Sequence, residues 1–323
     1  MLVNSKFPIL CLVISFICFV IFGCAPKAAR KPLQLPYIPK EISRGAGKEP
    51  RIKVFVAQEG QIREMPLEKY VEAVVAGEMK SSFSAEALAA QAILARTHAL
   101  EFVAEHKHST VNPAADISTS FEEAQAWAPE NVNDRIRQAV SRTRGKVVVY
   151  NGRYIKAWFH AHAGGLTAKA KEGLNYKYAE PPYTRVVKSA EGPGAPKDYA
   201  AWRAVFDKQE VINAVQSLGT APRNFNTIDI VQKGPSGRAT RIRVGGVEVP
   251  APDLRKALDS TRMKSTLLTG ARVEDNKVVF EGKGFGHGVG MSQWGAEELA
   301  RRGKKAEDII RYYYKDVDIV KIW

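Results

Sequence analysis

The sequence predicts an α+β fold: a single mixed body with antiparallel strands and a helical segment that carries the candidate catalytic residue. Three observations support this prediction. A short alternating strand near residue 51 is followed by two stretches with helical periodicity, and the pair Asn151-Gly152 marks a β-hairpin. Glycine recurs at every second position from Gly282 to Gly290, which neither a helix nor an ordinary strand interior tolerates well.

The first half of the chain alternates between strand and helix signals. Ser84 is the expected N-cap of an Ala-rich helix, and Asn151-Gly152 is the expected turn of the hairpin. In chain order we expect a strand at 51–56, a helix at 67–79, a helix from Ser84 to about 106, a mostly irregular stretch at 112–129, a helix at 131–142 and a hairpin at 146–160.

The second half starts with a proline-rich surface loop at 173–198 and continues with short elements. We expect a helix at 207–218, strands at 226–233, 239–244 and 247–249, a short helix at 254–258, strands at 265–269 and 271–281, and helices at 292–302 and 305–313. The chain is long enough for one large domain or two smaller ones. The body is therefore taken as 51–323, with an inserted subdomain near 200–260 left open.

The N-terminus has the features of an export signal. Lys6 precedes an apolar run from Phe7 to Gly23, which is short for a free-standing membrane helix. The run ends at Cys24 and resembles a bacterial lipoprotein signal over residues 1–24, in which Cys24 becomes lipidated. An uncleaved membrane anchor is the alternative. Residues 25–50, rich in proline and basic side chains, are expected to form a solvated tether. Both alternatives place the body on the extracytoplasmic face of the cell membrane.

Net charge and cysteine content limit the partners and the kinds of site that this protein can have. The net charge of +14 favours an anionic partner, but the sequence has no nucleic-acid-binding signature and no zinc-finger spacing. We therefore expect an anionic cell-surface partner and no nucleic acid. All three cysteines lie within residues 1–24, so the body has no disulfide and no thiolate metal site.

One carboxylate lies on an apolar helix face. Leu67, Val71 and Val74 form an apolar stripe of the helix expected at 67–79. At about 100° per residue, Glu78 falls within about 40° of each of them, whereas Glu68 falls towards the polar side. Burial raises the pKa of a carboxyl group, and a carboxylic acid that stays protonated near neutrality can act as a general acid.

The pattern around Glu78 leaves two interpretations open. Glu78 is either a general acid or the buried ion-pair partner of a basic residue such as Arg96 on the next helix. A similar choice applies to His160 and His162, which alternate at a strand end and so share one face. They mark either a metal site or a rim that contacts substrate.

The glycine-rich segment needs positive φ angles or a close approach of its backbone to another group. His287, Ser292 and Gln293 lie in or just after this segment, ahead of a helix signal. These polar side chains are therefore candidates for contacting a ligand.

Two long motifs and a short one resemble a known family, the SpoIID/LytB family. The resemblance spans about residues 50–320 in the family's order. Its motifs are the runs Leu67–Met79 with Phe83–Leu100, Gly284–Ala296, and the pair Tyr312-Tyr313. The resemblance implies peptidoglycan glycan strands as substrate. It also implies that Glu78, the Glu of the Glu-Met pair, is the catalytic acid of a lytic transglycosylase. For such a substrate we expect His287, Ser292 and Gln293 to hold sugar hydroxyl and acetamido groups, and the glycine backbone to let a rigid glycan approach closely. The further candidate substrate-binding residues are Arg96, His160 and His162.

The same resemblance implies an alternative function, and this sequence differs from some family members at one segment. Some members are named amidase enhancers, so a non-catalytic wall-binding module that assists a separate N-acetylmuramoyl-L-alanine amidase is the alternative function. Some sporulation members hold zinc in a Cys- and His-containing segment after the second helix. The matching run here, Asp116–Trp127, has neither residue type. We therefore predict no zinc and no other cofactor.

Overall fold

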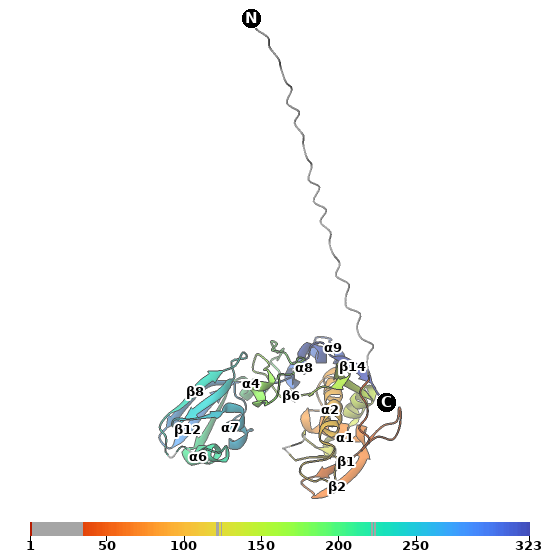
Figure 1. The fold of residues 1–323 in the computed structure, drawn as a ribbon, viewed down its shortest axis with the longest axis horizontal. Helices are drawn as coiled ribbons and strands as arrows, with labels where there is room; N and C mark the ends of the chain where they lie inside the picture. The colour runs from red at the N-terminus through yellow and green to blue at the C-terminus, as the bar shows by residue number, and fades with distance from the viewer. Residues whose placement is uncertain (2–34, 121–122, 124, 221, 223) are drawn as a thin grey trace. The chain divides into compact units, whose positions relative to one another are not determined.

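The computed structural model describes residue 1 and residues 35–120, 123, 125–220, 222 and 224–323 (Figure 1). Gln34–Trp323 form one compact unit. Apart from Met1, the predicted signal or anchor at 1–24, including Cys24, lies outside the described residues. Within the part of the chain that is described, no helix has both the length and the apolar character needed to cross a membrane.

The predicted α+β class is confirmed: helices alternate with small sheets that are mostly antiparallel. The first half of the chain contributes one three-stranded sheet, part of another, and three α-helices. Its elements are β1 (Arg51–Val56), β2 (Gln61–Pro66), α1 (Leu67–Glu78), α2 (Ala85–His106), β3 (Ile117–Ser118), the 3₁₀ turn η1 (Pro129–Asn131), α3 (Asp134–Arg142), β4 (Lys146–Tyr150) and β5 (Arg153–Tyr154). Strand β1 pairs antiparallel with β2 and parallel with β3.

The second half consists of shorter elements and returns to the first half at its end. Its elements are β6 (Phe159–His160), α4 (Ala170–Leu174), α5 (Lys197–Ala200), β7 (Trp202–Asp207), α6 (Lys208–Ser217), β8 (Ile228–Lys233), β9 (Ala239–Val244), β10 (Val247–Pro250), α7 (Ala251–Leu258), β11 (Leu268–Glu274), β12 (Lys277–Gly282), β13 (Met291–Ser292), α8 (Gln293–Arg301), α9 (Ala306–Tyr313) and β14 (Asp318–Lys321). Strand β14 pairs antiparallel with β4, and β13 pairs parallel with β6.

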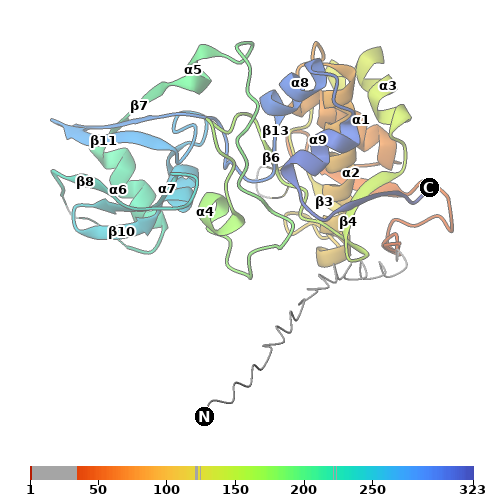
Figure 2. The same ribbon diagram turned by 90° about the horizontal axis from the view of Figure 1, so that it is seen from above.

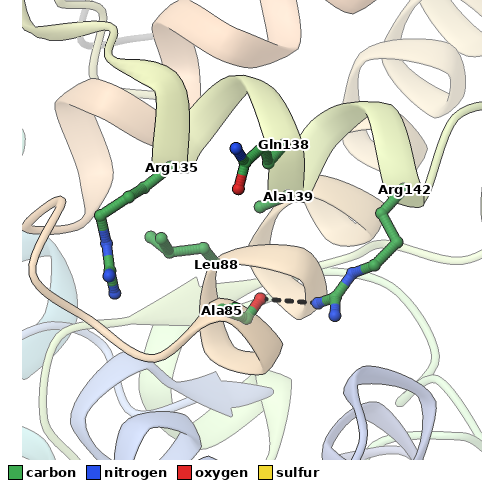
Figure 3. A pocket seen from close by; sticks show the side chains of 6 residues that line it. All are labelled: Ala85, Leu88, Arg135, Gln138, Ala139 and Arg142. Carbon is green, nitrogen blue, oxygen red and sulfur yellow. Dashed lines mark hydrogen bonds between the residues drawn. The ribbon is translucent and has the colours of Figure 1, made fainter.

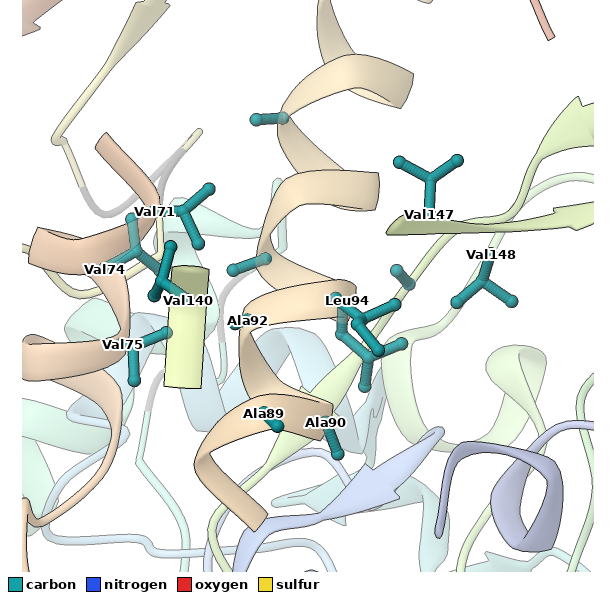
Figure 4. Packing of buried hydrophobic residues seen from close by; sticks show 14 of the residues in the cluster. Val71, Val74, Val75, Ala89, Ala90, Ala92, Leu94, Val140, Val147 and Val148 are labelled. Carbon is teal, nitrogen blue, oxygen red and sulfur yellow. The ribbon is translucent and has the colours of Figure 1, made fainter. Parts of the chain in front are cut away.

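Helix α2 is the centre of the main hydrophobic core. Figure 4 shows it between valines of α1 on one side and Val147 and Val148 of β4 on the other. It also contacts α3, α8 and α9. Because neighbours surround it, small side chains are needed on every face, and Ala89, Ala90 and Ala92 are fully buried. This packing explains the Ala-rich composition of the segment.

A second hydrophobic cluster forms between Trp202 and Phe280. It includes the sheet of order β11-β12-β7, the sheet of order β10-β9-β8, and helices α6 and α7 (Figures 1 and 2). Strand β12 leads from this cluster directly into the glycine-rich segment, which then enters β13 and α8. The glycine-rich segment therefore links the second cluster to the main core.

The structure differs from the expected elements in three respects. The strands expected at 265–269 and 271–281 are instead the hairpin β11–β12, because Asp275 takes a left-handed turn with a φ of 52°. Strands β2, β7 and β14 were not expected. Residues 35–50, expected to be a solvated tether, contact the body: Ile42 is 2% exposed and belongs to the main core.

Candidate active site

Glu78 is the last residue of α1, and its carboxylate is held by two donors. Oε1 accepts a hydrogen bond from the backbone N–H of Ala126 at 2.6 Å, and Oε2 accepts one from Nε2 of Gln293 at 3.1 Å. The side chain is half-buried. Burial raises the pKa of Glu78, and the bonds from Ala126 and Gln293 oppose that rise. The group is therefore both fixed in place and biased towards its protonated form.

Close packing places the Ala126 donor. Gly77 precedes Glu78 in the last turn of α1, and a Cβ atom there would lie 2.7 Å from the carbonyl carbon of Ala126. Glycine is required for the segment around Ala126 to approach α1 so closely. Ala128 extends this contact, since its N–H donates to the carbonyl of Ala73 at 3.1 Å. The N–H that binds Glu78 is thus part of a packed backbone rather than a free loop.

Gln293 comes to Glu78 from a position 215 residues later in the chain. It is the first residue of α8, and Ser292 is the N-cap: its Oγ accepts from the N–H of Gly295 at 3.2 Å and donates to Glu191 at 2.8 Å. Ser292 is fully buried and Gln293 is 6% exposed. Ser292 therefore positions the start of α8, and Gln293 is the predicted substrate-binding residue that the structure brings into contact with Glu78.

The glycine-rich segment is held by groups of the protein itself. Gly284, Gly286, Gly288 and Gly290 all have positive φ angles. At Gly290, where φ is 72°, a Cβ would overlap the carbonyl oxygen of Trp158 and the hydroxyl of Tyr314. Both anticipated requirements, positive φ and close approach, are met here. The close approach is to atoms of the protein, and not to a glycan.

His160 and His287 face each other across this segment, with ring centroids 5.7 Å apart. Nδ1 of His160 lies 3.1 Å from the carbonyl oxygen of Val289, and Nδ1 of His287 accepts from the N–H of Val289 at 3.0 Å. Burial, with the neighbouring imidazole of His287, holds the pKa of His160 well below its usual value, and burial lowers the pKa of His287 to about 3. Burial therefore favours the neutral form of both rings.

His162 also pairs with the glycine-rich segment. It forms an antiparallel bridge with Phe285, its Nδ1 accepts from the N–H of Gly164 at 3.0 Å, and its ring lies 6.0 Å from that of Tyr199. Burial lowers its pKa. Among the described residues there is no group of three or more His, Cys, Asp or Glu side chains arranged to hold a metal ion.

Arg96 does not pair with Glu78. Its guanidinium makes a bidentate contact with Glu68, at 2.6 and 3.0 Å, and Arg96 is completely buried. Glu68 also accepts hydrogen bonds from the N–H of Gly145 and from Nε1 of Trp323, both at 3.1 Å. The interpretation of Arg96 as the partner of Glu78 is wrong, and so is the placement of Glu68 on the polar side. Full burial also leaves Arg96 no surface with which to contact substrate.

Two participants in the site were missed in the sequence. Glu191 binds both the Ser292 hydroxyl and the N–H of Ala163, each at 2.8 Å. Arg238 is fully buried and donates to the carbonyl oxygens of Ala163 and Leu166, at 2.6 and 2.8 Å. No local pattern marks either residue, because each acts on segments that are distant in the chain.

A small pocket lies away from Glu78, between the start of α2 and one face of α3 (Figure 3). Its volume is about 150 Å³ and Arg142 closes one end by donating to the carbonyl of Ala85 at 2.9 Å. Ligand pockets usually exceed about 300 Å³. This pocket is therefore too small to hold a sugar chain, and it is not part of the site around Glu78.

The protein is thus a mixed α+β protein in which the half-buried carboxyl of Glu78, at the end of α1, meets the side-chain amide of Gln293, at the start of α8. Known proteins are similar in sequence to the segments that build this site. The family described as Stage II sporulation protein matches residues 57–150, which include Glu78, and a domain of unknown function matches residues 173–290.

Relatives extend the similarity over most of the chain. An uncharacterized protein of Brachyspira hyodysenteriae is 31% identical over 259 residues, 80% of this chain and 68% of the relative. Stage II sporulation protein D of Bacillus amyloliquefaciens is 31% identical over 292 residues, 84% of this chain and 81% of the relative. The amidase enhancer of Bacillus subtilis is 26% identical over 293 residues, 75% of this chain and 39% of the relative. The chain belongs to the SpoIID/LytB family.

Proposed function

We propose that this protein is a lytic transglycosylase that cleaves peptidoglycan glycan strands between N-acetylmuramic acid and N-acetylglucosamine, in sporulation or wall remodelling. The observation that supports it most is the geometry of Glu78, a half-buried carboxyl with a raised pKa, fixed by Ala126 and Gln293. General acids in enzymes need a carboxyl that remains protonated near the working pH. Membership of the family adds to this argument.

A single carboxyl suffices for the reaction. Glu78 donates its proton to the glycosidic oxygen as the bond to the muramic acid C1 breaks. The 6-hydroxyl of the same sugar then attacks C1, and the ionised Glu78 accepts the proton of that hydroxyl. The products are a free 4-hydroxyl on N-acetylglucosamine and a 1,6-anhydromuramyl end, with no water consumed. The intramolecular nucleophile supplies the proximity that a bound water supplies in hydrolases.

Gln293 suits both protonation states of Glu78. An amide has a donor side and an acceptor side, and the two are related by a rotation of the group. Nε2 donates to the ionised carboxylate, as at 3.1 Å in this structure. After the amide rotates, Oε1 can accept from the protonated carboxyl. Gln293 therefore keeps a hydrogen bond to Glu78 on both sides of the proton transfer.

The proposal includes the location and the partners. Lipidation at Cys24, or an uncleaved anchor at 1–24, would hold the body at the extracytoplasmic face of the membrane, where the glycan strands lie. The net charge of +14 would raise the local concentration of an anionic wall polymer.

A non-catalytic role is the second candidate, and one observation favours it: similarity to a protein named amidase enhancer. In that case the protein would bind the wall and assist a separate N-acetylmuramoyl-L-alanine amidase. Glu78 would then serve only to join α1 to α8 through Gln293.

The deciding experiment is mass spectrometry of products from peptide-free glycan strands incubated with the full chain. Glu78→Gln is the test variant. Glu72→Gln is the matched control, because Glu72 is on the same helix but pairs with the exposed Lys69 and not with Gln293. We expect anhydromuramyl ends from the wild type and from Glu72→Gln, and none from Glu78→Gln.

Other results would contradict the proposal in distinct ways. Reducing ends instead of anhydromuramyl ends would mean hydrolysis and a second catalytic carboxylate. No product from any folded variant, with stimulation of an amidase preserved in Glu78→Gln, would support the amidase-assisting role. Thermal unfolding is measured in parallel, since the amide of Gln can accept from only one of the two donors that hold Glu78.

A further inference from the structure

A second, larger pocket lies between the α4 region and the sheet of β8, β9 and β10. Its volume is about 340 Å³, within the range of ligand-binding pockets. Lys169, Lys171 and Glu172 line it from the α4 side, and Gln232, Thr240 and Arg241 line it from the two strands β8 and β9. The lining therefore includes three basic side chains and one carboxylate.

Glu172 has one satisfied and one unsatisfied oxygen. It is 3% exposed, and its Oε1 accepts hydrogen bonds from the N–H and the hydroxyl of Ser236, at 2.9 and 2.7 Å. Its Oε2 is buried and has no partner among the described residues. The carboxyl group is also fixed against Gly234, where a Cβ would lie 2.5 Å from its Cδ. A buried acceptor that is held so rigidly fits a donor on a ligand.

Thr240 contributes a second unsatisfied group to the same pocket. Its hydroxyl, on β9, is buried and also has no partner within the described part of the chain. A buried polar group without a hydrogen bond has lost its contacts with water and gained none in return. Two such groups in one pocket, one a carboxylate oxygen and the other a hydroxyl, indicate a ligand that carries both donors and acceptors.

The basic side chains define the charge of that ligand. Lys169 donates to the carbonyl of Thr184 at 3.2 Å, and Arg241 contacts Glu248 at 3.2 Å, so both are held in place. Lys171 is exposed and makes no ion pair with any described residue. A ligand with a carboxylate would pair with Lys171 at the rim of the pocket, next to Arg241, which also contacts Glu248.

We propose that this pocket is a saccharide subsite for an acidic N-acetylated amino sugar, the N-acetylmuramic acid residue of a glycan strand, away from the residue at which the strand is cut. The inference rests on the proposed function for its substrate class. The lactyl carboxylate faces Lys171 and Arg241. A ring hydroxyl or the acetamido N–H donates to Oε2 of Glu172, and a second sugar oxygen binds the hydroxyl of Thr240.

The test is a ligand-observed NMR titration of the full chain with N-acetylmuramic acid, using N-acetylglucosamine as the neutral analogue. Thr240→Val removes the hydroxyl and keeps the shape, so the free energy of unfolding is expected to stay constant or rise. Lys171→Glu reverses a charge at the rim. Lys233→Glu makes the same change at an exposed lysine of β8 that does not line the pocket.

We expect the Kd for N-acetylmuramic acid to rise roughly 3- to 10-fold in Thr240→Val and in Lys171→Glu, and to stay unchanged in Lys233→Glu. N-acetylglucosamine should bind at least about 5-fold more weakly to the wild type, because it lacks the carboxylate. Equal binding of the two sugars, or an unchanged Kd in both pocket variants, would overturn the inference.

Glu78→Gln separates this subsite from the cleavage site. Binding of N-acetylmuramic acid should survive in Glu78→Gln, and its loss there would overturn the inference. Pocket-dependent binding without anhydromuramyl products would mean that the proposed reaction fails and the subsite stands. If anhydromuramyl products form but the Kd for N-acetylmuramic acid is unchanged in Thr240→Val and Lys171→Glu, the proposed reaction stands and the subsite fails.

Discussion

Replacing Gln293 by methionine tests whether this residue sets the pKa of Glu78. Methionine keeps the length and helix propensity of glutamine and removes its hydrogen bond. That bond favours the ionised carboxylate. Its loss leaves Ala126 as the remaining donor and should raise the pKa of Glu78 further.

The magnitude follows from the geometry. A hydrogen bond to a charged group contributes about 1.5–3 kcal/mol, and one pKa unit corresponds to about 1.36 kcal/mol. The distance of 3.1 Å between Nε2 and Oε2 is at the long end for such a bond, which favours the lower limit. The rotated amide can also bond the protonated carboxyl, with about 0.5–1.5 kcal/mol, so only the difference between the two bonds changes the pKa. We therefore expect the pKa of Glu78 to rise by less than about one unit in Gln293→Met.

The assay is a pH titration of the full chain with ¹³C-labelled glutamate, followed by NMR at the side-chain carboxyl carbon. The Glu78 signal is assigned by its absence in Glu78→Gln. Gln138→Met, at an exposed position of α3, is the control. If the chain cleaves glycan, the alkaline limb of its pH–rate profile should move up by the same amount. An unchanged or lowered pKa in Gln293→Met would refute the role given to Gln293.

Three further predictions concern stability. Arg96→Leu leaves Glu68 buried without its cation, so denaturant unfolding should report a loss of about 3–5 kcal/mol; a loss below about 1 kcal/mol would contradict the buried ion pair. Gly290→Ala should prevent folding or greatly lower the Tm, because its Cβ overlaps backbone, whereas Gly303→Ala, with positive φ but open space, should cost only about 1–2 kcal/mol. His287 has a pKa of about 3 against 6.5 when unperturbed, so the folded state binds fewer protons than the unfolded state between these values. The free energy of unfolding should therefore fall as pH decreases from 6.5 to about 3, and His287→Asn should make that slope shallower; an unchanged slope would contradict the neutral, buried ring.

The comparison of expectation and structure is most instructive at α1. Helical periodicity located Glu78 on the apolar face, because a period of about 3.6 residues depends only on neighbours in the chain. The same arithmetic placed Glu68 towards solvent, yet Glu68 is buried. Its partners are Arg96 on α2, the N–H of Gly145 and the indole of Trp323. A carboxylate can be buried where tertiary structure supplies enough donors, and no local pattern shows them.

In the glycine-rich segment, too, the sequence indicates one feature and only the tertiary structure shows the other. The alternating glycines are enough to indicate positive φ angles, since other residues avoid that region for steric reasons. The groups that approach the glycines leave no trace in the segment itself. At Gly288 the approaching group is the guanidinium of Arg238, and at Gly290 it is the carbonyl of Trp158, from two different parts of the chain.

By itself the sequence determined the α+β class, most helices and their ends, the turn at Asn151-Gly152 and the unusual place of Glu78. These features arise from interactions among residues close in the chain. Only the tertiary structure decided that Gln293, 215 residues away, meets Glu78, and that Arg96 belongs to Glu68. Such pairings depend on how helices pack around α2, and packing is settled by the fit of many distant side chains at once.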